Sequence, residues 1–200
     1  MGRPSRAEER REEILKALLI AIEKDGLAET SMKSVAASIG IDRTTMHHYF
    51  RSWEELMFAG LDRVVEDYSV AFDQGITATA PRERLDQLIH AAFGAPFADR
   101  TRSRILNEFL VVAQKDDRTH QAVKAAYVEF EDKVLQAVCD AFPDVSQKRC
   151  LSAAYVLAQL MEGSSVFTDL GFDASRKKAA KTAAENILVE LDGGGENARN

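Results

Sequence analysis

The chain has 200 residues, of which 46% are hydrophobic and 29% charged, and its formal net charge at pH 7 is −6. This composition is typical of a soluble globular protein with one domain or two small ones. Two cysteines, Cys139 and Cys150, are too few and too far apart for a CxxC redox or zinc motif, and we expect that no signal peptide or long apolar span precedes them.

The charge is unevenly distributed along the chain. Residues 1–53 hold nine Lys or Arg and eight Asp or Glu, whereas the remainder holds 17 and 24. Because DNA binding depends on the local contact surface, the acidic total does not exclude a nucleic-acid partner. We expect a cytoplasmic protein with reduced thiols, and a redox-sensing pair stays open as an alternative.

The first residues, MGRPSR, form an unpatterned arm before a predicted helix from about Ala7 to Lys24. Arg3 and Arg6 in this arm suit a narrow minor groove, although a frayed, solvated terminus explains them equally well. Within the helix, apolar residues recur at helical spacing and predict one buried face. These residues are Ile14, Leu15, Leu18, Leu19 and Ile22.

The stretch SMKSVAASIGIDRTTMHHYF, residues 31–50, predicts two short helices joined by a glycine turn. Ser31 suits the start of the first helix and Asp42 the start of the second, because their side-chain oxygens can accept free backbone N–H groups. Gly40 supplies the conformational freedom that a tight helix end requires. This pattern is a helix-turn-helix.

The second of these helices separates apolar from hydrogen-bonding side chains. Met46, Tyr49 and Phe50 share one face, and the opposite face, fronted by Arg43, carries only groups that can donate to bases or phosphates. That face holds Thr44, His47, His48 and Arg51. We interpret it as a recognition helix for the major groove; a solvated surface helix is the alternative.

Ser52 and Glu55 form a capping-box pair that starts a longer helix at Trp53. Beyond residue 52 the sequence predicts helix after helix without a sustained strand pattern. The expected spans are 53–74, 82–94, 101–115, 118–141, 146–170 and 174–191, followed by a flexible tail over 192–200. The predicted class is all-α, with domains over 1–52 and 53–191.

The helical body contains a mixture of aromatic and polar side chains that is typical of a small-molecule pocket. Rings combined with carboxylates suit a cation, although each ring taken alone is more often part of a core. The candidate effector-binding residues are Phe93, Phe97, Asn107, Glu108, Phe109, Tyr127, Phe130, Glu131, Tyr155 and Glu162.

The last two predicted helices carry small and apolar side chains at helical spacing. Such faces permit close helix packing, so two hairpins from two chains could form a four-helix interface; docking within one chain is the alternative. The candidate dimer-interface residues are Leu157, Leu160, Met161, Ser164, Ala180, Ala183, Ala184, Ile187 and Leu188.

Residues 9–56 resemble the DNA-binding domain of the TetR family of bacterial transcription regulators, through the runs ILKALLIAIEKDGLAETSMKSVAASIGI and HHYFRSWEEL. The resemblance implies a three-helix headpiece, a ligand-binding body and a dimer formed by the last two helices. It departs from the family at His47 and Trp53, where Tyr and Lys often contact phosphates. The candidate DNA-binding residues are Arg3, Arg6, Ser31, Lys33, Arg43, Thr44, Thr45, His47, His48, Tyr49 and Arg51.

The C-terminal runs RSRILNEFLVVAQKDDRTHQAV and LAQLMEGSSV faintly resemble the BetI-like branch of that family. The expected function is a homodimeric repressor that a small-molecule effector releases from a palindromic operator in double-stranded DNA. No catalytic set, cofactor or metal site is predicted. A helical adaptor protein, an activator and a ligand-independent repressor remain alternatives.

Overall fold

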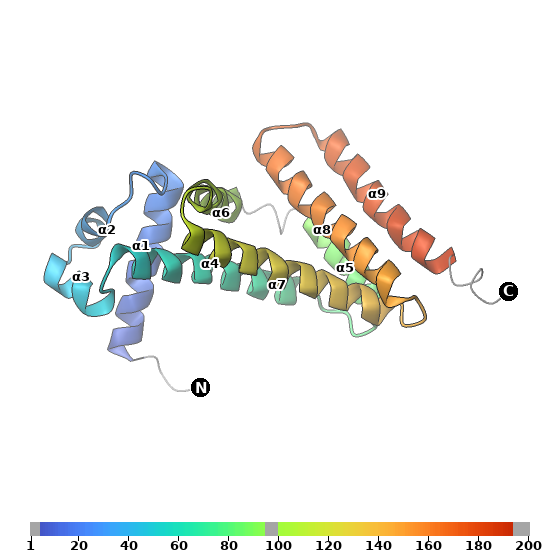
Figure 1. Cartoon of the computed structure of the whole chain (residues 1–200), viewed down its shortest axis with the longest axis horizontal. Helices are drawn as coiled ribbons and strands as arrows, with labels where there is room; N and C mark the ends of the chain where they lie inside the picture. The colour runs from blue at the N-terminus through green and yellow to red at the C-terminus, as the bar shows by residue number, and fades with distance from the viewer. Residues whose placement is uncertain (1–4, 95–99, 194–200) are drawn as a thin grey trace. The chain divides into compact units, whose positions relative to one another are not determined.

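The computed structural model describes the backbone of residues 5–94 and 100–193, and all regular secondary structure within those residues is helical (Figure 1), which confirms the predicted class. No helix in these ranges combines the length and apolar character needed to cross a bilayer. The helices are α1 (Arg6–Asp25), α2 (Met32–Ser38), α3 (Arg43–Tyr49), α4 (Trp53–Gly75), α5 (Pro81–Ala92), α6 (Arg100–Ala113), α7 (Asp117–Ala141), α8 (Gln147–Asp169) and α9 (Ala174–Gly193).

The chain divides into two compact units, which we call the headpiece unit and the body unit. The headpiece unit comprises residues 1–68 and 101–124, and the body unit comprises residues 69–100 and 125–200. The predicted boundary after residue 52 therefore differs from the division by contacts. Most of α4, together with α6 and the start of α7, belongs with the N-terminal helices, because side chains far apart in sequence pack together there.

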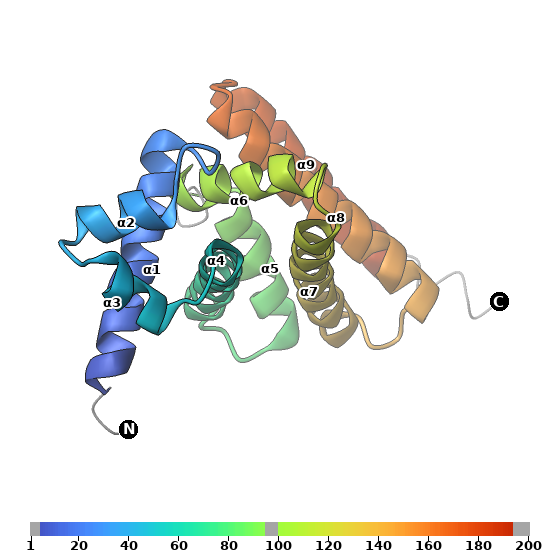
Figure 2. The ribbon, with the colours of Figure 1, turned by 60° about the vertical axis from the view of Figure 1, so that its left-hand side comes forward.

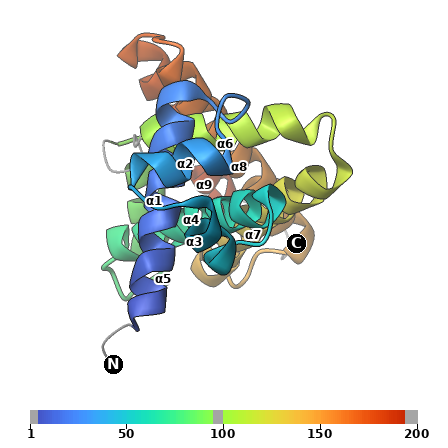
Figure 3. The ribbon, with the colours of Figure 1, turned by 90° about the vertical axis from the view of Figure 1, so that its left-hand side faces the viewer.

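The core of the headpiece unit forms where the apolar face of α1 meets the neighbouring helices. In α1, Ile14 and Leu18 are fully buried, as are Met46 beside the turn and Phe50 after α3. α2 packs against both α1 and α3 (Figure 3). A Cβ at Gly60 would lie 2.6 Å from Leu18 Cδ2, so a glycine in the middle of α4 allows this helix to approach α1 closely.

The body unit is built around one apolar cluster from α5, α7, α8 and α9. In Figure 1, α8 and α9 lie side by side as a hairpin, and α5 also contacts α9. Five residues of the predicted dimer set are buried in this cluster by the chain's own helices. They are Leu157, Met161, Ser164, Ala184 and Leu188, which are 0%, 4%, 6%, 0% and 3% exposed.

The remaining members of the predicted dimer set lie nearer the surface. Leu160, Ala180 and Ile187 are partly buried against the same cluster, whereas Ala183 is exposed. A different apolar face of α8 is open, with Val156 45% and Phe167 52% exposed. Which side of α8 meets the core was not evident from the sequence, because both sides carry apolar residues.

Candidate nucleic-acid interface

The helix-turn-helix is shaped by the two predicted caps and by glycine. The Ser31 hydroxyl accepts the Ser34 backbone N–H at 3.2 Å, and the Asp42 carboxylate accepts that of Thr45 at 2.7 Å, which confirms both caps. The hydrogen bonds from Thr45 lower the pKa of Asp42, so its carboxylate stays ionised at the start of α3. Gly40 has φ +66°, a conformation in which other residues are strained.

The recognition helix α3 is buried on one side and open on the other. Met46 is 1% exposed and anchors the inner side. The outer side presents the exposed residues Arg43, Thr44, His47 and His48, followed by Arg51 just beyond the helix. These side chains form a surface of hydrogen-bonding groups without a carboxylate, as a groove-reading helix requires.

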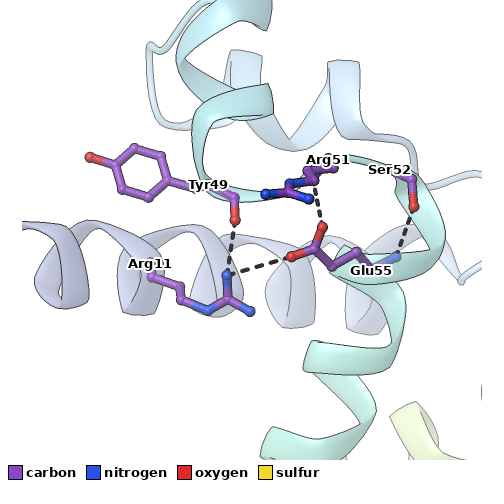
Figure 4. A network of polar contacts seen from close by, with 5 residues as sticks. All are labelled: Arg11, Tyr49, Arg51, Ser52 and Glu55. Atoms are coloured by element: carbon purple, nitrogen blue, oxygen red, sulfur yellow. Dashed lines mark hydrogen bonds and ion pairs between the residues drawn. The ribbon is translucent and has the colours of Figure 1, made fainter.

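The C-terminal end of α3 is held by an arginine from α1, as Figure 4 shows. Arg11 Nη1 donates to the Tyr49 carbonyl oxygen at 2.9 Å, and the Arg11 guanidinium lies 4.1 Å from the centroid of the Phe50 ring. Arginine satisfies a free carbonyl at a helix end and favours its negative dipole. Arg11 therefore fixes the direction of α3 relative to α1. No local sequence pattern indicates this contact, since its partners are 38 residues apart.

Figure 2 shows the course of the chain from α3 into α4, and Glu55 in the first turn of α4 stabilises this junction (Figure 4). Its backbone N–H donates to the Ser52 hydroxyl at 3.1 Å, and its carboxylate accepts the Arg51 backbone N–H at 2.8 Å. The predicted capping pair is confirmed in position, but the carboxylate reaches the residue before Ser52. The Arg51 side chain stays exposed.

The remaining candidate DNA contacts occupy different settings. Arg3 lies outside the described residues, and Arg6 is the first residue of α1 rather than part of an arm. Ser5 caps this helix and forms a capping box with Glu8, and the sequence carries the corresponding Ser-x-x-Glu signal. Lys33 is exposed on α2, and Thr45 is half-buried.

Tyr49 is also half-buried, with its ring packed edge-on against His48 at 5.1 Å between centroids. Ser31 is exposed beside the free N–H groups at the start of α2, where a phosphate can be bound. Trp53, in place of the family's usual Lys, begins α4 and is half-buried.

Glu108, a predicted effector-binding residue, holds the loop between α1 and α2. Its Oε2 accepts the Leu27 backbone N–H at 2.9 Å, and a Cβ at Gly26 would lie only 3.2 Å from the same oxygen. Gly26 has φ +83°, and its carbonyl oxygen accepts the Thr30 hydroxyl at 2.7 Å. The carboxylate of α6 thus fastens the loop that leads into the helix-turn-helix.

The other predicted effector residues are divided between the two units. Asn107 and the fully buried Phe109 belong with Glu108 to the headpiece unit. Phe93 and Phe130 pack in or against the body core, and Glu131 is half-buried on α7. Phe97 lies outside the described residues.

Tyr127 and Glu162 form the one predicted effector pair that the described residues join directly. The Tyr127 hydroxyl donates to Glu162 Oε1 at 2.8 Å between α7 and α8. Burial raises the pKa of Glu162, and the negative charge of Asp169 raises it further, while the Tyr127 hydrogen bond acts in the opposite direction. Tyr155, which is 53% exposed, lies seven residues before Glu162 and so on the same stripe of α8.

The chain is similar to known regulators over most of its length. Residues 14–59 match the family model of bacterial regulatory proteins of the tetR family. The HTH-type transcriptional regulator BetI of Brucella anthropi is 25% identical over 187 residues, covering 92% of this chain and 94% of the relative.

Solved structures share the fold. A TetR transcription regulator from Haloarcula marismortui superposes with a TM-score of 0.76 at 18% identity, covering 90% of this chain and 96% of that one. A transcriptional regulator from Saccharomonospora viridis, solved in complex with choline, superposes with a TM-score of 0.72 at 18% identity, covering 90% and 95%. The helix-turn-helix geometry and the family model agree that residues 14–59 form a DNA-binding domain of the tetR family of bacterial regulatory proteins, and the curated relatives and solved structures support a TetR-family transcriptional regulator.

Proposed function

We propose that the protein is a homodimeric repressor that a small-molecule effector releases from a palindromic operator. The observation that carries this proposal is α3 itself: Met46 buries its inner side, Arg11 fixes its C-terminal end, and its outer side presents only hydrogen-bonding groups. A helix held in this way can present its side chains to base edges in one orientation.

Dimerisation follows from the small number of bases that one α3 can read. A two-fold dimer places two recognition helices on successive major-groove faces and reads a palindrome. The exposed side of α8 supports such a dimer: Val156, Gly163 and Phe167 are spaced seven and four residues apart, so they share one stripe. Ala183 on α9 is also exposed. We assign the dimer contact to this stripe instead of to the buried residues.

The effector site is proposed to include Tyr127 and Glu162. A partly buried carboxylate with a hydroxyl partner favours a ligand cation, because the cation offsets the cost of removing that charge from water. Aromatic rings nearby would strengthen the attraction. The neighbour solved with choline supports a small ammonium compound as the first effector class to test.

Release would operate through helices common to the two units. α4 and α7 each contribute residues to the headpiece unit and to the body unit, so a shift of either helix on effector binding acts on both. Coupling of about 1–3 kcal/mol would change operator affinity roughly 5- to 150-fold, and the operator would weaken effector binding by the same factor.

The test is binding of the purified protein to the DNA that flanks its own gene, measured by fluorescence anisotropy across a salt series. We expect salt-dependent, sequence-selective binding that Arg43→Ala weakens and that Arg84→Ala, an exposed arginine on α5, leaves unchanged. Choline is then added as the first effector probe. Equal weak binding to every duplex, unaffected by Arg43→Ala, would instead favour the adaptor alternative.

A further inference from the structure

Two side chains on the exposed face of α3 form a hydrogen bond with each other. Arg43 Nε lies 3.2 Å from His47 Nε2, and the four-residue spacing places both on one side of the helix. A guanidinium only donates, so the imidazole must accept through Nε2 and carry its proton on Nδ1. The free donor of the His47 ring in this arrangement is Nδ1–H.

This contact leaves the reading end of Arg43 available. A guanidinium has five N–H donors, and the bond to His47 uses the one on Nε. The four donors on the two terminal nitrogens remain for a bidentate contact with the O6 and N7 atoms of guanine. Among the described residues, the Arg43 guanidinium forms a hydrogen bond with His47.

We propose that His47 is a positioning residue for Arg43, which orients the guanidinium toward one base pair, rather than a phosphate contact. The inference rests on operator recognition by α3. An arginine that is already ordered loses less conformational freedom when it binds than an unrestrained one. The expected consequence is stronger discrimination at the base pair that Arg43 reads.

His47 Nε2 must accept a hydrogen bond to position Arg43, but it must donate one to contact a phosphate. A phosphate oxygen needs a donor, whereas Nε2 here is an acceptor engaged with Arg43. Loss of a phosphate contact weakens binding to all sequences about equally, and where a charged side chain makes the contact, its loss also changes the salt slope by about one unit. Loss of a positioning contact relaxes selectivity at one base pair and leaves the salt slope unchanged.

The experiment uses the full-length protein and a duplex that the wild type selects from a random library. Affinity is measured by anisotropy for that duplex and for versions with one base pair changed at a time. His47→Leu removes the acceptor, and His47→Gln retains one without a titrating ring. His120→Leu and His120→Gln are the matched controls, because His120 is an exposed histidine on α7, outside the recognition helix.

We expect His47→Leu to reduce discrimination at the Arg43 base pair by about 3- to 10-fold, with an unchanged salt slope and with recovery in His47→Gln. In an Arg43→Ala background the same change should have no further effect, because the two residues act as one unit. Thermal unfolding confirms that each variant folds.

A uniform loss of affinity with a smaller salt slope, or discrimination equal to that of the wild type in His47→Leu, would overturn the positioning role. Failure of the wild type to select any duplex would be a different result, because it would contradict operator recognition itself and the inference that rests on it. The two failures are distinguished by the wild-type measurement alone.

Discussion

Different kinds of contact stabilise the interior of each of the two units. In the headpiece unit, polar side chains join elements distant in sequence: Arg11 binds the end of α3 and Glu108 binds the loop before α2. The body unit depends chiefly on an apolar cluster shared by four helices. Polar contacts specify one orientation of a helix, whereas apolar faces tolerate several partners. This contrast suits a headpiece that must present α3 in a fixed direction.

The contrast is tested most strongly by two adjacent residues on α8. Leu157 is fully buried in the body core, whereas Val156 is 45% exposed on the proposed dimer stripe. We expect Leu157→Ala to lower the free energy of unfolding by about 2–5 kcal/mol, because it leaves a cavity. Chemical denaturation measures this loss.

The neighbouring change should affect assembly instead of folding. Val156→Glu places a charge on an exposed stripe, so we expect it to change the stability of one chain by no more than about 0.5 kcal/mol but to weaken the dimer. Sedimentation equilibrium measures the second effect. A dimer that survives Val156→Glu unchanged would contradict the assignment of this stripe.

The next largest effect concerns Glu108, whose carboxylate holds the loop at Leu27. Glu108→Leu removes the acceptor for the Leu27 N–H, and an unmade hydrogen bond at this buried residue should cost about 1–3 kcal/mol. Glu108→Gln is the control, since its amide oxygen can still accept. Hydrogen exchange at Leu27 reports the contact directly: exchange should accelerate in Glu108→Leu and much less in Glu108→Gln.

If Glu108→Gln abolished effector binding while the exchange rate of the Leu27 amide stayed unchanged, the result would support the effector-binding role that the sequence suggested for Glu108. That suggestion came from its position beside apolar residues. Its partner, the Leu27 N–H, is 81 residues away, and no local sequence pattern indicates a contact over that separation.

The sequence predicted the headpiece well because its features are local. A helix cap acts within three residues, so Ser31 and Asp42 identified the starts of α2 and α3, and Gly40 identified the turn between them. The capping box of Ser5 and Glu8 is equally local, and reading it would have placed Arg6 in α1. Contacts such as that of Arg11 depend on tertiary packing and could not be read in advance.

The sequence predicted the helices of the body unit but not which face of each helix is buried. α8 has apolar or small residues around most of its circumference, so periodicity did not distinguish Leu157, which meets the core, from Val156, which is exposed. Both Glu108 and Glu162 stand beside apolar residues in the sequence, so they were predicted to share one site, although they lie in different units. The specific part of the family resemblance lies in the headpiece, and the faint resemblance in the body did not indicate which helix faces are buried.

The smallest expected effect is a change in the pH dependence of stability at Glu162. Burial first, and then the charge of Asp169, raise the pKa of this carboxyl above its ordinary value of 4.5. A raised pKa means that the folded state binds the proton more tightly, so this stabilisation is complete below pH 4.5 and is lost as the pH rises through the folded-state value. Glu162→Gln cannot titrate but can still accept the Tyr127 hydroxyl. In urea denaturation across pH, the variant should therefore gain stability relative to the wild type from acid toward neutral pH; a constant difference or the opposite trend would show that Glu162 is not destabilised by its surroundings.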